Sequence, residues 1–155
     1  MRFNTMHNRG FSLLEILLVV GIMGVLAAVI AFPLSSFHRT QTLRGATEDV
    51  AAFIQEAHSM TLASHDSSQY GVYLTTNSVV LFTGTTYTAG AATNRVMTIP
   101  SGVTLAWSLH GNGSTIVFRR LSGETNQYGT ITVSLSSPTI SRTITVSKLG
   151  SVDSN

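Results

Sequence analysis

A single carboxylate, Glu15, lies in an otherwise apolar stretch that covers residues 11–32. An ionised acid inside hydrocarbon costs at least a few kcal/mol, so such a residue usually serves a function. The acid needs a cation, but the stretch holds none, and the nearest one is Arg9. A cut between Gly10 and Phe11 would create a second cation, the new α-amino group of Phe11. This group would lie about one helical turn from the carboxylate. The candidate partners of Glu15 are therefore Arg9 and such an amine, on its own chain or on a neighbouring one.

The apolar stretch is long enough to span a membrane as a helix. Its 22 residues would form a helix of about 33 Å, and the hydrocarbon core of a bilayer is about 30 Å thick. Arg2 and Arg9 precede the stretch, so we expect its N-terminal end to face the cytoplasm. Two other interpretations stay open at this point. A secretory signal peptide would be cut after Val29-Ile30-Ala31, although its apolar region normally has about 7–15 residues, and an ordinary single-pass anchor would leave the acid unexplained.

The charge composition argues against a globally basic nucleic-acid-binding domain. The net charge is +2, and the two leading arginines account for it, since seven basic and seven acidic residues balance in the remainder. The balance is uneven, because five basic residues but only Glu124 and Asp153 as acids follow from Arg95 onward. The chain has no cysteine, which excludes a disulfide, a thiolate metal site and a cysteine nucleophile.

Nothing in the sequence indicates an enzyme, and we expect no catalytic residue, no cofactor and no metal. The histidines lack the i, i+4 helical spacing that is typical of metal ligands. The sequence contains no G-x-S-x-G nucleophile turn and no glycine-rich phosphate loop before a helix. We expect all five histidines to be solvated surface residues: His7, His38, His58, His65 and His110.

Four basic residues in the second half of the chain form a candidate DNA-binding set. They are Arg119, Arg120, Arg142 and Lys148, on or beside expected strands. If they converge in space, they would attract the phosphates of DNA. The alternative is that they are dispersed, solvated strand residues that keep the sheet soluble and protect its edges.

The segment after the apolar stretch has the periodicity of an amphipathic helix. Pro33 either kinks a long helix or begins a new one. From residue 34 to about residue 63, apolar residues recur at steps of three and four. We expect this stripe to pack on the folded body of the protein: Leu43, Ala46, Val50, Phe53, Ile54, Ala57 and Met60.

After residue 68 the pattern changes to short alternating runs between turn residues, which is typical of strands. We expect strands at residues 70–75, 79–83, 96–99, 103–108, 115–120, 129–135 and 143–148. Residues 83–94 are rich in Thr, Gly and Ala and predict a surface loop. The sequence His110-Gly111-Asn112-Gly113 predicts a tight hairpin turn. The expected fold class is α+β: a long N-terminal helix, membrane-spanning in its first half and packed by its second half on a β-rich head.

The segment Gly10-Phe11-Ser12-Leu13-Leu14-Glu15, with the apolar stretch behind it, closely resembles the N-terminal signal of type IV pilins and type II secretion pseudopilins. The resemblance implies that a membrane peptidase, the prepilin peptidase/N-methyltransferase, cuts between Gly10 and Phe11 on the cytoplasmic face and N-methylates Phe11. It also implies that Glu15 neutralises the new amine of an adjacent subunit during filament assembly. The partners are then this peptidase, other pilins or pseudopilins, and the cytoplasmic membrane.

A looser resemblance points to the GspH/FimT branch of minor pilins and H-type pseudopilins. It rests on the helix end at residues 53–58 with the strand at 72–74, and on segments 116–118, 122–123, 129–133, 144–146 and 150–152. The chain has His58 where the branch often has arginine. Some minor pilins of this branch resemble DNA receptors for natural transformation, which implies DNA as another partner.

The expected domain organisation follows from these segments. Residues 1–10 form a cleaved leader, 11–32 a transmembrane and assembly helix, 33–66 its amphipathic continuation, and 67–155 the β-rich head. The expected function is that of a minor structural subunit of a type II secretion pseudopilus or a type IV pilus. The subunit would be held in the cytoplasmic membrane with its head outside and then drawn into the filament. The alternative is a DNA-binding minor pilin that acts in DNA uptake.

Overall fold

The computed structural model describes residues 11–136 and 139–155, and the side chains of residues 29–37 lie outside the description. The chain divides into two compact units, with the boundary between His38 and Arg39. The helix and strands are α1 (Leu13–Leu62), η1 (His65–Ser67), β1 (Tyr70–Leu74), β2 (Ser78–Thr83), β3 (Arg95–Thr98), β4 (Val103–Leu109), β5 (Thr115–Val117), β6 (Gly129–Ser136), β7 (Thr139–Val146) and β8 (Val152–Ser154).

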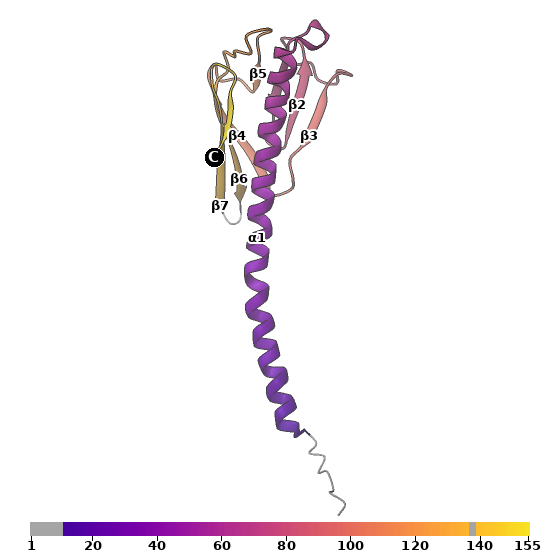
Figure 1. The fold of residues 1–155 in the computed structure, drawn as a ribbon, viewed down its shortest axis with the longest axis vertical. Coiled ribbons are helices and arrows are strands. Elements are labelled where there is room, and N and C mark those ends of the chain that lie inside the picture. The colour runs from indigo at the N-terminus through magenta and orange to yellow at the C-terminus, as the bar shows by residue number, and fades with distance from the viewer. Residues whose placement is uncertain (1–10, 137–138) are drawn as a thin grey trace, which may run out of the picture. The chain divides into compact units, whose positions relative to one another are not determined.

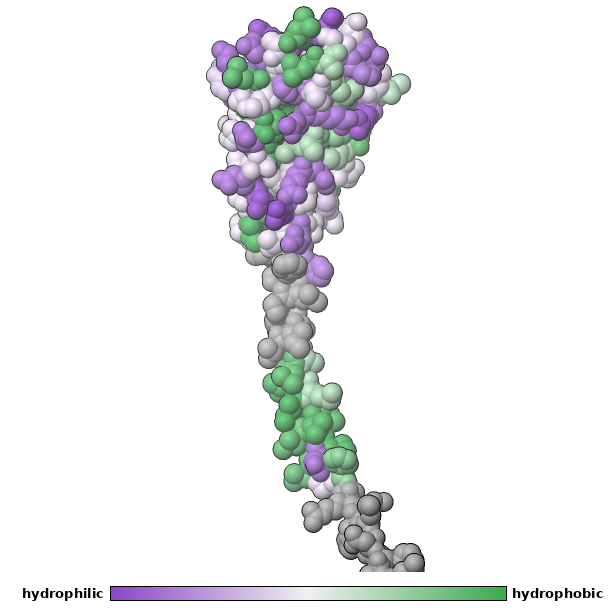
Figure 2. Space-filling view, viewed as in Figure 1, coloured by the Kyte–Doolittle hydropathy of each residue, from purple (hydrophilic) through white to green (hydrophobic). Residues whose placement is uncertain are grey.

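The first unit contains the N-terminal part of α1. Helix α1 continues through Pro33, so this residue does not begin a new helix. The side chains of residues 11–28 are exposed in the single chain, and Figure 2 shows this segment as an almost continuous hydrophobic surface. Within the described residues, no helix has both the length and the apolar character needed to cross a membrane. The spanning segment expected at residues 11–32 stays a prediction.

The second unit, Arg39–Asn155, is a β-rich head on the second part of α1. Two four-stranded antiparallel sheets form it, with strand orders β3-β2-β1-β5 and β4-β6-β7-β8. The part of α1 from Arg39 onward lies against both sheets (Figure 1). One core therefore joins α1 to the inner faces of both sheets, and the expected α+β fold, a helix packed on a β-rich head, is confirmed.

The apolar stripe of α1 packs as its spacing predicted. Five residues of the stripe are buried: Leu43, Ala46, Val50, Ile54 and Ala57. The other two, Phe53 and Met60, are partly buried and pack against the core. Apolar residues at helical spacing share one face of a helix and favour burial of that face.

Two threonines on the same face were not expected to be buried. The hydroxyl of Thr47 donates to the carbonyl of Leu43 at 2.8 Å, and the hydroxyl of Thr61 donates to the carbonyl of Ala57 at 2.8 Å. The Thr61 hydroxyl also accepts a hydrogen bond from the backbone N–H of Tyr70 at 3.0 Å. Because buried hydroxyls need partners, these bonds make the threonines compatible with the core and tie the end of α1 to β1.

Five of the expected strands coincide with β1, β2, β3, β4 and β6 to within about one residue at each end. The other two differ. Strand β5 ends at Val117, earlier than expected, because the next residues form a turn in which the N–H of Arg119 donates to the carbonyl of Glu124. Strand β7 begins at Thr139, earlier than expected, and β8 was not expected at all. Arg142 interrupts the apolar alternation of β7, which hid the first half of that strand.

The hairpin expected at residues 110–113 is wrong. These residues connect β4 to β5, but β4 pairs with β6 and β5 pairs with β1, in the other sheet. The chain does turn here, with positive φ values of 89° at Gly111 and 54° at Asn112. The turn therefore carries the chain from one sheet to the other, and a local turn signal does not reveal which strands pair after it.

Residues 84–94 contain no strand, in agreement with the expected loop. The loop is partly anchored on the outer face of the first sheet. The ring of Tyr87 stacks on that of Tyr73 at 4.1 Å between centroids and contacts Phe82 edge-on at 5.7 Å. Phe82 is fully buried, so the loop protects an apolar residue that points away from the main core.

Candidate assembly segment and head surface

The start of α1 positions the expected assembly residue, Glu15. The hydroxyl of Ser12 accepts a hydrogen bond from the backbone N–H of Glu15 at 3.2 Å, and the carbonyl of Ser12 accepts one from Ile16 at 3.2 Å. Ser12 is therefore the N-cap of the helix, and the Ser-x-x-Glu spacing is that of a capping box. The role of Ser12 was not expected, although this spacing in the sequence would have indicated it. Glu15 lies in the first turn of α1, where the helix dipole favours a negative charge.

The surface around Glu15 is apolar. Phe11, Glu15, Ile16, Val19 and Val20 line a shallow hollow of about 350 Å³. Phe11 is 78% exposed, and Glu15 is also exposed. In the part of the chain that the structure describes, no basic group lies within ion-pair distance of Glu15. The segment thus presents one acid within an apolar surface, and the expected cleavage residue Gly10 lies outside the described residues.

Three of the four basic candidates lie on two neighbouring turns of the head. Arg119 and Arg120 are in the turn between Phe118 and Thr125, which form an isolated bridge. The carbonyl of Lys148 accepts a hydrogen bond from the N–H of Thr125 at 3.0 Å, so its turn lies against the first. All three basic side chains are exposed.

Arg142 is separate from the other three basic residues. It lies within β7 opposite Val133. Four residues separate it from the end of the strand, a distance of about 13 Å along the strand. It is half-buried and shares its face of β7 with the buried residues Ile144 and Val146. Alternate residues of a strand point to the same side of the sheet, so Arg142 lies on the core-facing side. It lines a hollow with Thr40, Ile140, Ser141, Thr143 and Asn155.

His58 is not the solvated residue that the sequence predicted. Its ring packs edge-on against Phe118 at 5.2 Å between centroids, and burial lowers the pKa of the imidazole below 6.5. A Cβ atom at Gly123 or at Gly150 would collide with the His58 ring. The two glycines therefore let the two basic turns close over the histidine. Its position one residue after Ala57, at the edge of the buried stripe, was the available signal.

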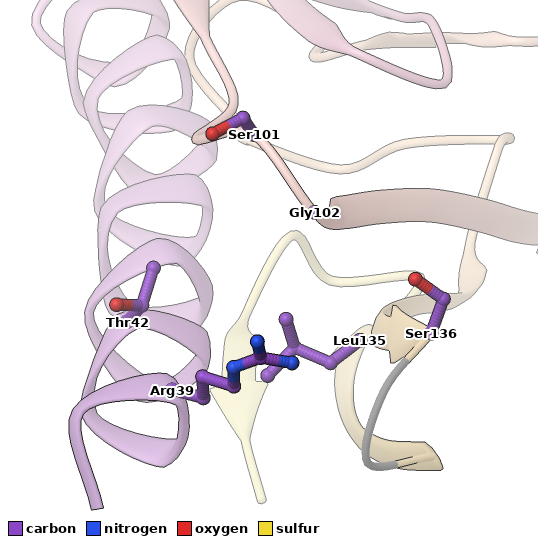
Figure 3. A pocket seen from close by; sticks show the side chains of 6 residues that line it. All are labelled: Arg39, Thr42, Ser101, Gly102, Leu135 and Ser136. Atoms are coloured by element: carbon purple, nitrogen blue, oxygen red, sulfur yellow. The ribbon is translucent and has the colours of Figure 1, made fainter. Parts of the chain in front are cut away.

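A second hollow lies where α1 enters the head. It has a volume of about 360 Å³ and is lined by Arg39, Thr42, Ser101, Gly102, Leu135 and Ser136. In Figure 3 the guanidinium group of Arg39 extends toward Leu135, below the turn that carries Ser101 and Gly102. Across residues 11–136 and 139–155, no group of three or more His, Asp and Glu side chains could hold a metal ion.

Comparisons with known proteins agree with this geometry. Residues 5–31 match the prokaryotic N-terminal methylation motif, and this range contains Gly10, Phe11 and Glu15. The chain is similar to a crystal structure of the type IV minor pilin FimU from Pseudomonas aeruginosa. The TM-score is 0.58 at 15% sequence identity, and the match covers 77% of this chain and 92% of that chain. No curated protein sequence matches this one.

Proposed function

We propose that this pilin-like chain, with a prepilin-type N-terminal motif and the fold of a type IV minor pilin, is a structural subunit of a cell-surface filament. The match of residues 5–31 to the methylation motif carries this proposal. The pilin-like fold supports it independently. The filament is a type IV pilus or a type II secretion pseudopilus, and the chain is a minor component of it.

The first step is proteolytic. The prepilin peptidase hydrolyses the amide bond between Gly10 and Phe11, which leaves a carboxylate on Gly10 and a free α-amino group on Phe11. The same enzyme then transfers a methyl group to that amine from a methyl donor, and the amine keeps its positive charge. The leader of residues 1–10 leaves with its two arginines, Arg2 and Arg9.

The second step is assembly through Glu15. Before assembly, residues 11–32 anchor the subunit in the cytoplasmic membrane, with its head outside. A carboxylate and an amine on separate chains each carry a desolvation cost in hydrocarbon, and this cost falls when they pair. A neighbouring subunit out of axial register would leave both charges unpaired. The exposed position of Glu15 among apolar side chains suits such a contact, so the pair fixes the register of the filament.

The cleavage site provides the test of this function. In the native cell, Gly10→Val should block cleavage, leaving a chain heavier by residues 1–10 in the membrane fraction and absent from sheared filaments. Gly10→Ala is the matched control and should be processed and assembled. A Gly10→Val chain that is cut and assembled normally would contradict the proposal.

The type of filament needs a separate measurement. Deletion of the chain should reduce either secretion through a type II system or the number of surface pili, and complementation should restore that one property. Unchanged secretion and unchanged piliation would contradict the role as a filament subunit.

DNA capture by the head is a second candidate function. One observation favours it: Arg119, Arg120 and Lys148 lie on two turns that contact each other. Arg142, which belongs to the same expected set, lies elsewhere on the core-facing side of β7. Retardation of duplex DNA that is lost in Arg119→Ala/Arg120→Ala would support this role, and an unretarded duplex at low salt would contradict it.

A further inference from the structure

Two turns close the end of the head that lies farthest from Arg39. The first turn, between Phe118 and Thr125, contains Gly123, and the second, residues 147–151, contains Gly150. A Cβ on Gly123 would lie 3.0 Å from Cδ2 of Leu62, at the end of α1, and a Cβ on Gly150 would collide with the carbonyl oxygen of Gly123. The two turns and the last residue of α1 therefore form one continuous surface.

Three exposed leucines lie on this surface. Leu62 is 41% exposed, Leu121 is 76% exposed and Leu149 is 71% exposed. Leu121 lies two residues from Gly123, and Leu149 directly precedes Gly150. Figure 2 shows hydrophobic surface at the upper end of the head beside hydrophilic surface. We call Leu62, Leu121 and Leu149, with the neighbouring Arg119, Arg120 and Lys148, the leucine patch.

The conformation of Leu121 makes this exposure notable. Its φ is 69°, in the left-handed region that is unfavourable for a bulky side chain. A glycine or asparagine would fit this backbone better, and a polar side chain would suit this exposure better. Neither the strain nor the exposed leucine helps the head to fold, so an intermolecular contact is the better explanation.

The charges around the leucines indicate the kind of partner. Arg119 and Lys148 are exposed, and Nη1 of Arg120 donates to the carbonyl of Ser67 at 2.8 Å. The nearby acids are Glu124, which is half-buried, and Asp66, whose side chain is 75% exposed and lies 3.0 Å from the ring of His65. Three basic side chains thus stand against two acidic ones, so the net charge around the patch is positive.

We infer that the leucine patch docks a different protein chain, through a segment whose apolar side chains are flanked by aspartate or glutamate. The leucines would form the dehydrated centre of the contact and the basic residues its rim, as in protein–protein interfaces generally. A second copy of this chain fits less well, because it would place like charges opposite each other. DNA fits less well, because single strands are usually bound by aromatic stacking and duplexes by phosphate contacts, and neither uses exposed leucines.

Photo-crosslinking in the native cell identifies the segment that touches the patch. A photo-reactive amino acid replaces Leu121, and mass spectrometry locates the crosslinked residues of the partner. The inference predicts a segment of another protein that contains apolar residues flanked by Asp or Glu. Crosslinks to nucleic acid, to lipid or to a second copy of this chain would overturn it, and so would the absence of a crosslink.

Binding to the full-length protein in detergent micelles then tests the side chains. The probe is a fluorescent synthetic peptide of the crosslinked segment, and the readout is its anisotropy. Leu121→Gly should weaken binding at least tenfold although it relieves the backbone strain, so the loss cannot be attributed to unfolding. Lys148→Glu should weaken binding as well, and added salt should reduce the affinity of the unmodified protein.

Val96→Ser is the matched control for these variants. Val96 is 63% exposed on the edge strand β3, away from the two turns, and its replacement should leave the affinity unchanged. Equal affinities for the unmodified protein and Leu121→Gly would overturn the inference. So would a fluorescent DNA duplex that binds the patch while the peptide does not.

Discussion

At the scale of single residues, Glu15 and Ser12 show how a helix start serves two purposes. Ser12 holds the N–H of Glu15, so the first turn is formed before any partner arrives. The carboxylate itself is left exposed among apolar side chains. A preformed first turn fixes where this charge lies, so in the proposed assembly the cation of a neighbouring subunit would meet it in one register only.

Removal of the charge of Glu15 tests whether this charge is needed for assembly. Glu15→Gln keeps the shape of the side chain, so we expect normal cleavage but at least about tenfold less protein in sheared filaments, equivalent to about 1.4 kcal/mol. Glu48→Gln is the matched control, because Glu48 lies on the same helix and pairs with exposed Arg44 at 2.8 Å. Immunoblots of filament and membrane fractions measure the outcome, and normal incorporation of Glu15→Gln would argue against the pairing mechanism.

His58 predicts a pH dependence of stability. Its folded-state pKa lies below the unfolded value of 6.5 because of burial. Well above pH 6.5 both states hold a neutral ring, and the ring does not make the free energy of unfolding depend on pH. As the pH falls below 6.5, the unfolded state takes up the proton first, so this free energy decreases until the pH passes the folded-state pKa.

Urea unfolding between pH 7.5 and pH 5 measures this effect. The difference in unfolding free energy between the two pH values should be smaller in His58→Gln than in the unmodified protein. Identical pH dependence in the two proteins would show that His58 does not couple the proton to folding.

At the scale of elements, the packing of the first sheet depends on a glycine in β1. A Cβ on Gly71 would lie 2.6 Å from Cζ of Phe82 and 2.7 Å from the carbonyl oxygen of Ile116. The first contact is with a buried ring and the second with backbone, so neither neighbour can easily move. Gly71 therefore lets β2 and β5 approach β1 from either side.

Gly71→Ala should lower the free energy of unfolding by about 1–3 kcal/mol through overpacking. Gly113→Ala is the control, because its Cβ would meet only the Thr115 nitrogen at 3.9 Å, and its effect should stay within about 0.5 kcal/mol. Urea denaturation of both variants measures the difference. Equal stabilities would mean that the sheet relaxes around the added methyl group.

Periodicity explains which elements could be predicted from the sequence. The stripe of α1 and most strands follow repeats of 3.6 and 2 residues, which depend on local geometry alone. The crossing from β4 to β5 and the strand β8 depend on pairings with distant segments, so local patterns did not reveal them. The first half of β7 was not predicted either, because Arg142 occupies a core-facing position where the alternating pattern requires an apolar residue.

The candidate sites divide in the same way. Phe11 and Glu15 could be proposed from the sequence because their spacing lies within one segment, and the Ser12 cap could have been predicted from that segment as well. The grouping of Leu121 with Leu149 could not be predicted, because it requires the turn after β5 to meet the turn after β7. The burial of His58 depends on the same contact between the two turns.

At the scale of the whole molecule, the two units differ in what their surfaces offer. The N-terminal unit carries the methylation motif and one acid on an apolar surface, which suit processing and filament assembly. The head carries the leucine patch, which suits recognition of another protein. In a pilin-like subunit the first unit would thus serve every filament of this kind, whereas the head would determine which neighbour or cargo the subunit meets.

The N-terminal residue of the protein recovered from native membranes tests the central claim most directly. Mass spectrometry of the intact chain and of its N-terminal peptide should find N-methylphenylalanine at Phe11, with residues 1–10 absent. A mature chain that still begins at Met1, or that begins at Phe32 after cleavage behind Ala31, would contradict the account.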